Sequence, residues 1–179
     1  MVPLAEAERQ IEVTAERLAL LHLAFARTIV DELGEEQGKK LVLKAIKNYG
    51  KKVGEEARRK VTALGLSPLP ENYGKASDLP EYGMHEGREL VTVDGENRTR
   101  AYGCVMGKVW VEQGEAELGR LYCYVDAAKY MAYNPDFKLI HTKALPDGDE
   151  YCELCVRPTT GQEKQDFRDD NADWSYIDS

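Results

Sequence analysis

The chain has 179 residues, enough for one buried core and too few for two comfortable domains. Its composition is 42% hydrophobic, and its formal net charge of -8 argues against a general nucleic-acid binder, which needs a cationic surface. No apolar run reaches the roughly 18 residues of a membrane span, and charged residues interrupt any signal-peptide core near the N-terminus. We therefore expect a cytoplasmic protein with no nucleic-acid or membrane partner, whose four cysteines stay reduced.

Two long helices are predicted at the N-terminal end, over residues 5–33 and from residue 35 to Gly65. The expected apolar stripe of the first helix consists of Ile11, Leu18, His22, Phe25, Ile29 and Leu33. Gly34 stands in the usual position after a helix end, and His22 on this stripe is expected to be a hydrogen-bonded core histidine. Gly50 and Gly54 weaken the second helix and indicate either a kink or the close approach of another backbone.

The rest of the chain alternates between turn signals and short periodic segments. Residues 66–88 hold several prolines and glycines and read as an irregular cover that includes His85. Residues 89–93 and 98–105 flank Asp94-Gly95 and predict a hairpin. A helix is expected over residues 115–133, and a second hairpin over residues 137–145 and 150–157.

These elements predict an α+β fold in which a helical pair packs on a small antiparallel sheet of two hairpins with an intervening helix. We expect a single domain over residues 1–158, divided into a helical part (1–65), an irregular cover (66–88) and a sheet with its helix (89–158). Residues 159–179 are rich in acidic side chains and read as a mobile C-terminal tail, although Trp174 and Tyr176 indicate that its end docks.

The predicted helix over residues 115–133 carries an unusual second face. Cys123, Asp126 and Tyr130 lie roughly opposite its apolar stripe, on a face with few charges that we expect to be covered. A carboxylate on a covered face needs a partner or a catalytic role. The structural alternative is that Asp126 is simply paired and that Cys123 packs as a small apolar residue.

The other cysteines follow from strand alternation. Cys152 and Cys155 are three residues apart on a strand, so their side chains should point to opposite faces and should not act together. We expect Cys152 inside and Cys155 at the surface or at an interface. Cys104 follows Gly103 at the end of the first hairpin, where a glycine permits close backbone approach.

Several short strings now form an ordered set. They are GC at 103–104, GRLYCYVD at 119–126, NP at 134–135, Thr142 and GDEYCE at 148–153. In this order they resemble the L-2-amino-thiazoline-4-carboxylic acid hydrolase family, which is itself distantly similar to 4-vinyl-reductase-like domains. The resemblance covers about residues 10–158. Two positions depart from the family pattern: Leu154 stands where an aromatic residue is more frequent, and His141 stands where arginine or lysine is commoner.

The resemblance implies a hydrolase that opens a small cyclic thiazoline by adding water to the amidine-like C2 carbon. Cys123, Asp126, Cys152 and Cys104 are then the candidate catalytic residues. Either Cys123 is the nucleophile with Asp126 as its base, or Asp126 activates a water and the cysteines shape the pocket. The candidate substrate-binding residues are His141, Thr142, Arg120 and Tyr130, with His141 or Arg120 receiving the substrate carboxylate.

Three alternatives remain open from the sequence. We predict no cofactor, but zinc held by Cys104, Cys123 and Cys152 would make a metal-bound water the nucleophile. The 4-vinyl-reductase-like domains include small-molecule sensors. The distant similarity to them suggests a non-catalytic small-molecule-binding domain as the competing function. The long apolar stripe of the first helix favours a homodimer.

Overall fold

The computed structural model describes residues 2–80 and 82–178. The helices are α1 (Leu4–Leu33), α2 (Glu35–Ala63), α3 (Val105–Glu112), α4 (Ala116–Cys123), α5 (Val125–Tyr133) and α6 (Gly161–Arg168). The strands are β1 (Gly87–Val93), β2 (Glu96–Tyr102), β3 (Phe137–Lys143) and β4 (Tyr151–Pro158). Short 3-10 turns are η1 (Pro70–Ala76), η2 (Leu145–Asp147) and η3 (Ser175–Asp178). The predicted α+β class is confirmed.

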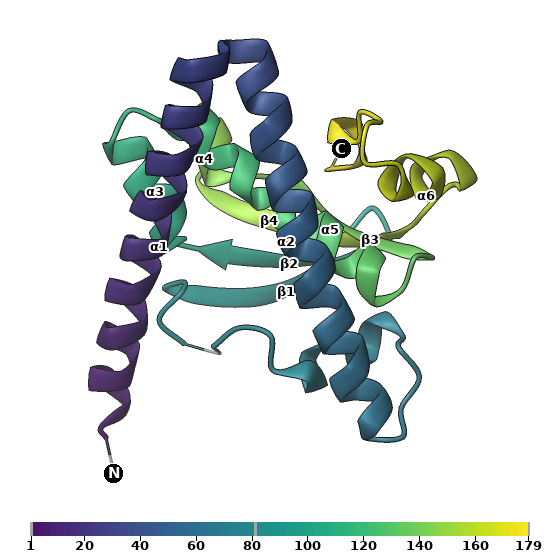
Figure 1. Cartoon of the computed structure of the whole chain (residues 1–179). Helices are drawn as coiled ribbons and strands as arrows, with labels where there is room; N and C mark the ends of the chain where they lie inside the picture. Colours follow the sequence, from purple (N-terminus) through teal and green to yellow (C-terminus); the bar gives the residue numbers. More distant parts are fainter. Residues whose placement is uncertain (1, 81, 179) are drawn as a thin grey trace.

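Helices α1 and α2 form a long antiparallel hairpin that reverses at Gly34, whose φ of 78° favours glycine (Figure 1). The buried stripe of α1 is offset from the predicted one and consists of Ala15, Ala19, His22, Leu23, Ala26 and Val30. Phe25 and Leu33, which we expected inside, are exposed. Alanines allow neighbouring helices to approach closely, so the small side chains turn inward and the large ones turn out.

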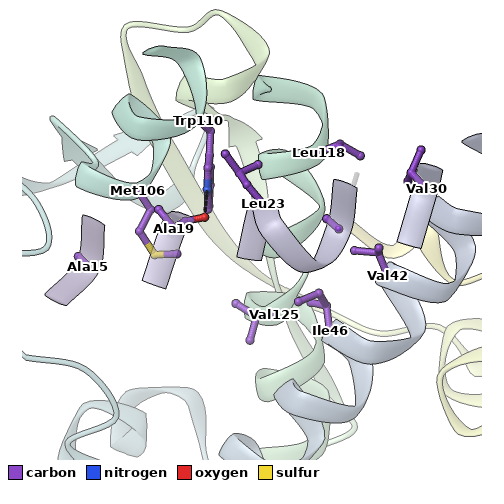
Figure 2. Close-up of a cluster of buried hydrophobic side chains, with 11 residues drawn as sticks. Ala15, Ala19, Leu23, Val30, Val42, Ile46, Met106, Trp110, Leu118 and Val125 are labelled. Atoms are coloured by element: carbon purple, nitrogen blue, oxygen red, sulfur yellow. Dashed lines mark hydrogen bonds between the residues drawn. The ribbon is translucent and has the colours of Figure 1, made fainter. Parts of the chain in front are cut away.

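The core under α1 is built around Trp110 of α3, which is 1% exposed. Its indole nitrogen donates to the carbonyl oxygen of Ala19 at 3.3 Å, and Leu23, Val42 and Leu118 belong to the same cluster (Figure 2). His22 also lies here and contacts the Leu118 carbonyl at 2.9 Å, as expected of a hydrogen-bonded core histidine. This cluster ties the helical hairpin to α3 and α4.

Helix α5 lies between α2 and β3 (Figure 1). A Cβ on Gly50 would stand 2.5 Å from the Ala128 Cβ, and one on Gly54 would stand 2.1 Å from the Lys129 carbonyl oxygen. The predicted close approach of another backbone at these glycines is therefore confirmed, and the partner is α5. This contact fixes the helix that carries Asp126.

The four strands form one antiparallel sheet in the order β1-β2-β4-β3. Asp94 and Gly95 join β1 to β2 with φ angles of 52° and 81°, as a type I′ hairpin turn requires. Strand β2 ends at Tyr102, before the predicted boundary, because Cys104 caps the start of α3. Sequence patterns did not reveal α3.

The expected helix over residues 115–133 is in fact two helices, α4 and α5, which meet at Tyr124. Residues after 158 also differ from the expectation of a mobile tail. Helix α6 begins with a capping box between Thr160 and Glu163. Trp174 is buried beside α5 as predicted, whereas the second predicted anchor, Tyr176, is 42% exposed and Ile177 is buried in its place. The sequence is acidic overall, but these few apolar anchors are sufficient to order it.

Candidate active site

The most unusual group of side chains lies where α4 and α5 meet β3. The helix restart after Tyr124 places Asp126 in the first turn of α5, where the helix dipole stabilises a negative charge. Its carboxylate is 20% exposed, so it is largely covered but still open to solvent. Cys123, three residues earlier, is also partly exposed. Both residues are thus partly buried, as expected, although the break at Tyr124 places Cys123 on α4 and Asp126 on α5.

Two basic side chains lie against Asp126. The Lys129 ammonium is 2.8 Å from Oδ1, and the His141 Nε2 is 3.6 Å from Oδ2. Burial alone would raise the pKa of Asp126, but Lys129 and His141 outweigh it and hold the pKa below the ordinary value. Asp126 is consequently a carboxylate near neutral pH.

Lys129 was missed in the sequence analysis. Its ammonium also lies 2.9 Å from the Asp78 carboxylate. Burial would lower the pKa of this lysine, but the two carboxylates raise it, so Lys129 remains charged. The available signal was its three-residue spacing from Asp126, which places both on one side of a helix.

His141 stands between two carboxylates. Its Nδ1 is 3.3 Å from Asp178 Oδ1, and its backbone N–H donates to the same oxygen at 2.8 Å. Burial would lower the pKa of His141, but Asp178 and Asp126 raise it overall. The imidazole is 5% exposed and projects its Nε2 toward Asp126. This arrangement suits a group that takes up and gives back a proton.

Arg120 supports the far end of this chain of charges. Its NH1 lies 2.8 Å from Asp178 Oδ2, and its Nε donates to Asp147 at 2.9 Å. The guanidinium also lies over the Tyr124 ring, 5.3 Å from the ring centroid. Arg120 thus already carries two carboxylate partners and is poorly placed to receive a third.

The three cysteines predicted to converge lie in the same region. Cys104 and Cys152 share a thiol hydrogen bond, which lowers the pKa of Cys104 and raises that of Cys152. Burial raises the pKa of Cys123, and the Arg120 guanidinium opposes this shift only in part. Cys123 also interacts electrostatically with both other thiols. Near neutral pH we expect Cys123 as a thiol and not as a thiolate.

Cys155 lies apart from these three, as strand alternation predicts, but it is not at the surface. It is 1% exposed, and its thiol donates toward the carbonyl oxygen of Asn97. Strand β4 is a central strand with β2 and β3 on either side, and Arg98 and Arg157 act electrostatically on this thiol. The expectation of an exposed Cys155 is therefore wrong.

Two of the predicted substrate-binding residues, Thr142 and Tyr130, have partners of their own in the structure. Thr142 sits at an irregularity between His141 and Lys143, where its hydroxyl donates to Glu153 Oε1 at 2.8 Å. Tyr130 stacks on Tyr73, with ring centroids 4.3 Å apart. Burial raises the pKa of the Tyr130 phenol to about 12. Tyr130 can line the site as a neutral phenol, whereas Thr142 belongs to a different cluster.

A metal site was the open alternative for the thiols. Within residues 2–80 and 82–178, no three His, Cys, Asp or Glu side chains are arranged to hold a metal ion. Cys104, Cys123 and Cys152 accordingly do not form such a group.

A cleft of about 740 Å³ lies at the surface; five glutamates are among its lining residues, and Asp126 and His141 are not. Its walls come from α1, from α3 and from the segment around His85 and Arg88. Burial, followed by the neighbouring Arg88, lowers the pKa of His85 to about 4, and Arg88 donates to His85 Nδ1 at 3.0 Å. His85 therefore lines this cleft and also interacts electrostatically with Asp126.

Together these features define a small α+β protein with a partly open acid–base cluster beside three thiols. Residues 14–156 match the family model described as L-2-amino-thiazoline-4-carboxylic acid hydrolase, and the chain belongs to this family. The match runs from within α1 into β4 and includes the predicted cysteines, Asp126 and His141, but it ends before Asp178. No curated protein and no solved structure matches the chain. In the described residues, no helix is long and apolar enough to cross a membrane.

Proposed function

We propose that this protein hydrolyses L-2-amino-thiazoline-4-carboxylate or a close analogue, opening the ring by adding water at C2. Family membership supports the reaction class. The observation that carries the assignment to this site is the 3.6 Å gap between Asp126 Oδ2 and His141 Nε2. At that separation the two groups attract each other as an ion pair without a direct hydrogen bond, so both atoms can still contact a water molecule or the substrate.

The reaction adds one water molecule overall. The water oxygen bonds to C2, which carries the exocyclic amine, the ring nitrogen and the ring sulfur. The tetrahedral adduct collapses with cleavage of the C2–S bond, and the sulfur leaves as a thiolate that takes up a proton. The product is an N-carbamoyl-cysteine with a free thiol. Cleavage of the bond to the ring nitrogen would instead give an S-carbamoyl product with a free amine.

We assign the proton transfers to Asp126 and His141. The Asp126 carboxylate orients the water and accepts a proton as the C2–O bond forms. The protonated His141, whose pKa is raised by its two carboxylate neighbours, donates a proton to the leaving sulfur. Cys123 then acts as a thiol in the pocket wall, because burial raises its pKa and disfavours the nucleophilic thiolate.

We assign the substrate carboxylate to Arg88 in place of Arg120. Arg120 already pairs with Asp147 and Asp178. Arg88 lines the cleft and donates to neutral His85, and among the described residues it has no carboxylate within ion-pair distance. A guanidinium without a carboxylate partner is well suited to a planar carboxylate ligand.

The experiment is incubation of the purified protein with L-2-amino-thiazoline-4-carboxylate, with thiol release followed by a colorimetric reagent and the product identified by mass. Asp126→Asn is the test variant, and Asp136→Asn, an exposed carboxylate paired with Lys164, is the matched control. Thiol formation that depends on Asp126 but not on Asp136 supports the proposal. Binding without turnover would instead establish the competing sensor function, and release of amine without thiol would overturn the assignment of the C–S bond.

A further inference from the structure

The last element of the chain, η3, reaches back into the candidate site from outside the family match. The Asp178 side chain has no exposed surface and lies at the edge strand β3. One carboxylate oxygen accepts from the His141 backbone and lies 3.3 Å from its Nδ1, while the other lies 2.8 Å from Arg120 NH1. Figure 1 shows the C-terminal segment returning to the sheet beside β3.

This segment is held in place by contacts of its own. Lys138 of β3 donates to the Ile177 carbonyl at 2.8 Å and to Glu163 at 2.7 Å. Lys47 of α2 donates to the carbonyls of Asp166 and Asp169 at 3.0 and 2.8 Å. A buried lysine ammonium is costly without hydrogen-bond partners, and here the C-terminal segment supplies them, so its displacement is disfavoured. The location of Asp178 is therefore fixed by two elements of the domain.

We propose that Asp178 is a positioning residue for His141. Its carboxylate accepts from Nδ1–H of the imidazole and thereby directs Nε2 toward Asp126. Arg120 holds the same carboxylate through its other oxygen. Residues 161–178 are then a part of the site that the family match does not include. The effect on turnover rests on the proposed function, whereas the effect on the imidazole does not.

Charged and titratable groups from four elements surround His141. Asp178 of η3 and Asp126 of α5 favour the imidazolium, while Arg120 of α4 opposes it. The Cys152 thiol of β4 also interacts with His141. Because Asp178 contributes both a hydrogen bond and a charge, its removal should lower the pKa of His141 more than any change at the periphery.

The test is a titration of the histidine side chains by NMR in the full chain. There are only three histidines, and His141→Gln identifies the resonance of interest. Asp178→Asn keeps an oxygen that can accept from the His141 backbone, but it removes the charge. We expect His141 in this variant to titrate at or below the value of an exposed histidine, and Asp178→Glu to restore a raised pKa.

The matched control is Asp170→Asn, which removes an exposed carboxylate of the same segment that pairs with Lys51. It should leave the His141 titration at its wild-type position. An unchanged titration in Asp178→Asn, or an equal fall in Asp170→Asn, would overturn the proposal. If Asp178→Asn does not fold, the wild-type titration decides, since a His141 pKa that is not raised contradicts the proposal.

Turnover supplies a separate readout. If the chain hydrolyses the thiazoline, Asp178→Asn should lower kcat by about tenfold or more and move the basic limb of its pH profile to lower pH, with KM little changed. An unshifted basic limb would contradict a role through His141. If no thiazoline is turned over at all, the proposed function fails, and the titration still tests Asp178.

Discussion

Two clusters of covered charge flank strand β4, and they are built differently. On one face, Glu153 is 3% exposed and accepts from Arg98 at 2.8 Å, from Arg100 at 2.9 Å and from Thr142 at 2.8 Å. Burial would raise the pKa of Glu153, but these donors lower it to about 2. Both carboxylate oxygens have close partners, so this cluster is closed.

The cluster around His141 is less complete. Its imidazole lies 3.3 Å from one carboxylate and 3.6 Å from the other, and Asp126 is partly open to solvent. Buried charges are costly when their pairing is incomplete. A site that keeps incompletely paired charges therefore suggests that these groups bind or react with a ligand. The comparison teaches that the degree of pairing, more than burial itself, separates a structural ion cluster from a candidate active site.

The largest expected effect is on the open cluster. His141→Gln removes the group assigned to proton transfer, and we expect kcat on the thiazoline to fall by about a thousandfold. Glutamine can still accept or donate a hydrogen bond, so the midpoint of thermal unfolding should move little by comparison. Steady-state kinetics and a thermal melt on the same preparation measure both. A variant that loses stability but keeps its turnover would place His141 with the structural clusters.

The closed cluster should respond in stability. Glu153→Gln leaves Arg98 and Arg100 without their shared carboxylate, and we expect a loss of about 3 kcal/mol in the free energy of unfolding. Urea denaturation measures it. Glu36→Gln, at an exposed pair with Lys40 on α2, is the control and should change little. A negligible loss in Glu153→Gln would remove the distinction between the two clusters.

Glu153 should also make the free energy of unfolding depend on pH. Because the folded pKa of Glu153 is about 2, below its ordinary value of 4.5, its stabilising contribution is present above about pH 4.5. That contribution is lost as the pH falls toward 2. The stability difference between the wild type and Glu153→Gln should therefore shrink across this interval in acid urea titrations. His141 acts in the opposite sense, because its raised pKa gives a contribution that is complete below about 6.5 and lost as the pH rises.

A smaller effect is expected at the cleft. Arg88→Gln removes the cation assigned to the substrate carboxylate and should raise KM about tenfold, which corresponds to about 1.4 kcal/mol. The turnover number should change less, because Arg88 does not contact the reacting carbon in this assignment. Arg58→Gln, an exposed arginine on α2, is the control. An equal rise in KM for both variants would indicate a general charge effect.

The smallest effect on activity is expected at Thr142. Thr142→Val keeps the shape of the side chain but removes its hydrogen bond to Glu153, so about 1 kcal/mol of stability should be lost. Turnover should stay within about twofold of the wild type. A loss of kcat without a loss of stability would restore Thr142 to the substrate site.

The sequence predicted the elements that carry strong local signals. Gly34 and Asp94-Gly95 marked the turns correctly, since their positive φ angles are local requirements. Helix α3 was missed because its valines at 105, 109 and 111 resemble a strand segment. The folded C-terminal segment was missed because its order depends on distant partners such as Lys47 and Lys138.

Prediction of the site shows the same division. The partial burial of Cys123 and Asp126 was expected from helical periodicity, although the helix breaks between them, and the separation of Cys152 from Cys155 followed from strand alternation. Asp178 was missed because it reaches His141 only through the folded C-terminal segment. Arg88 was missed because the sequence placed it in an irregular segment, whereas it lies in β1 next to His85. Burial of Cys155 could not be predicted without knowing that β4 is a central strand.

The most direct test of the central claim is the turnover of L-2-amino-thiazoline-4-carboxylate by Asp126→Asn relative to the wild type, measured on folded protein. If Asp126 and His141 activate water, thiol release by the wild type should fall by about a hundredfold or more in the variant. A variant that releases thiol at a rate within about twofold of the wild type would contradict the assignment of the chemistry to this cluster.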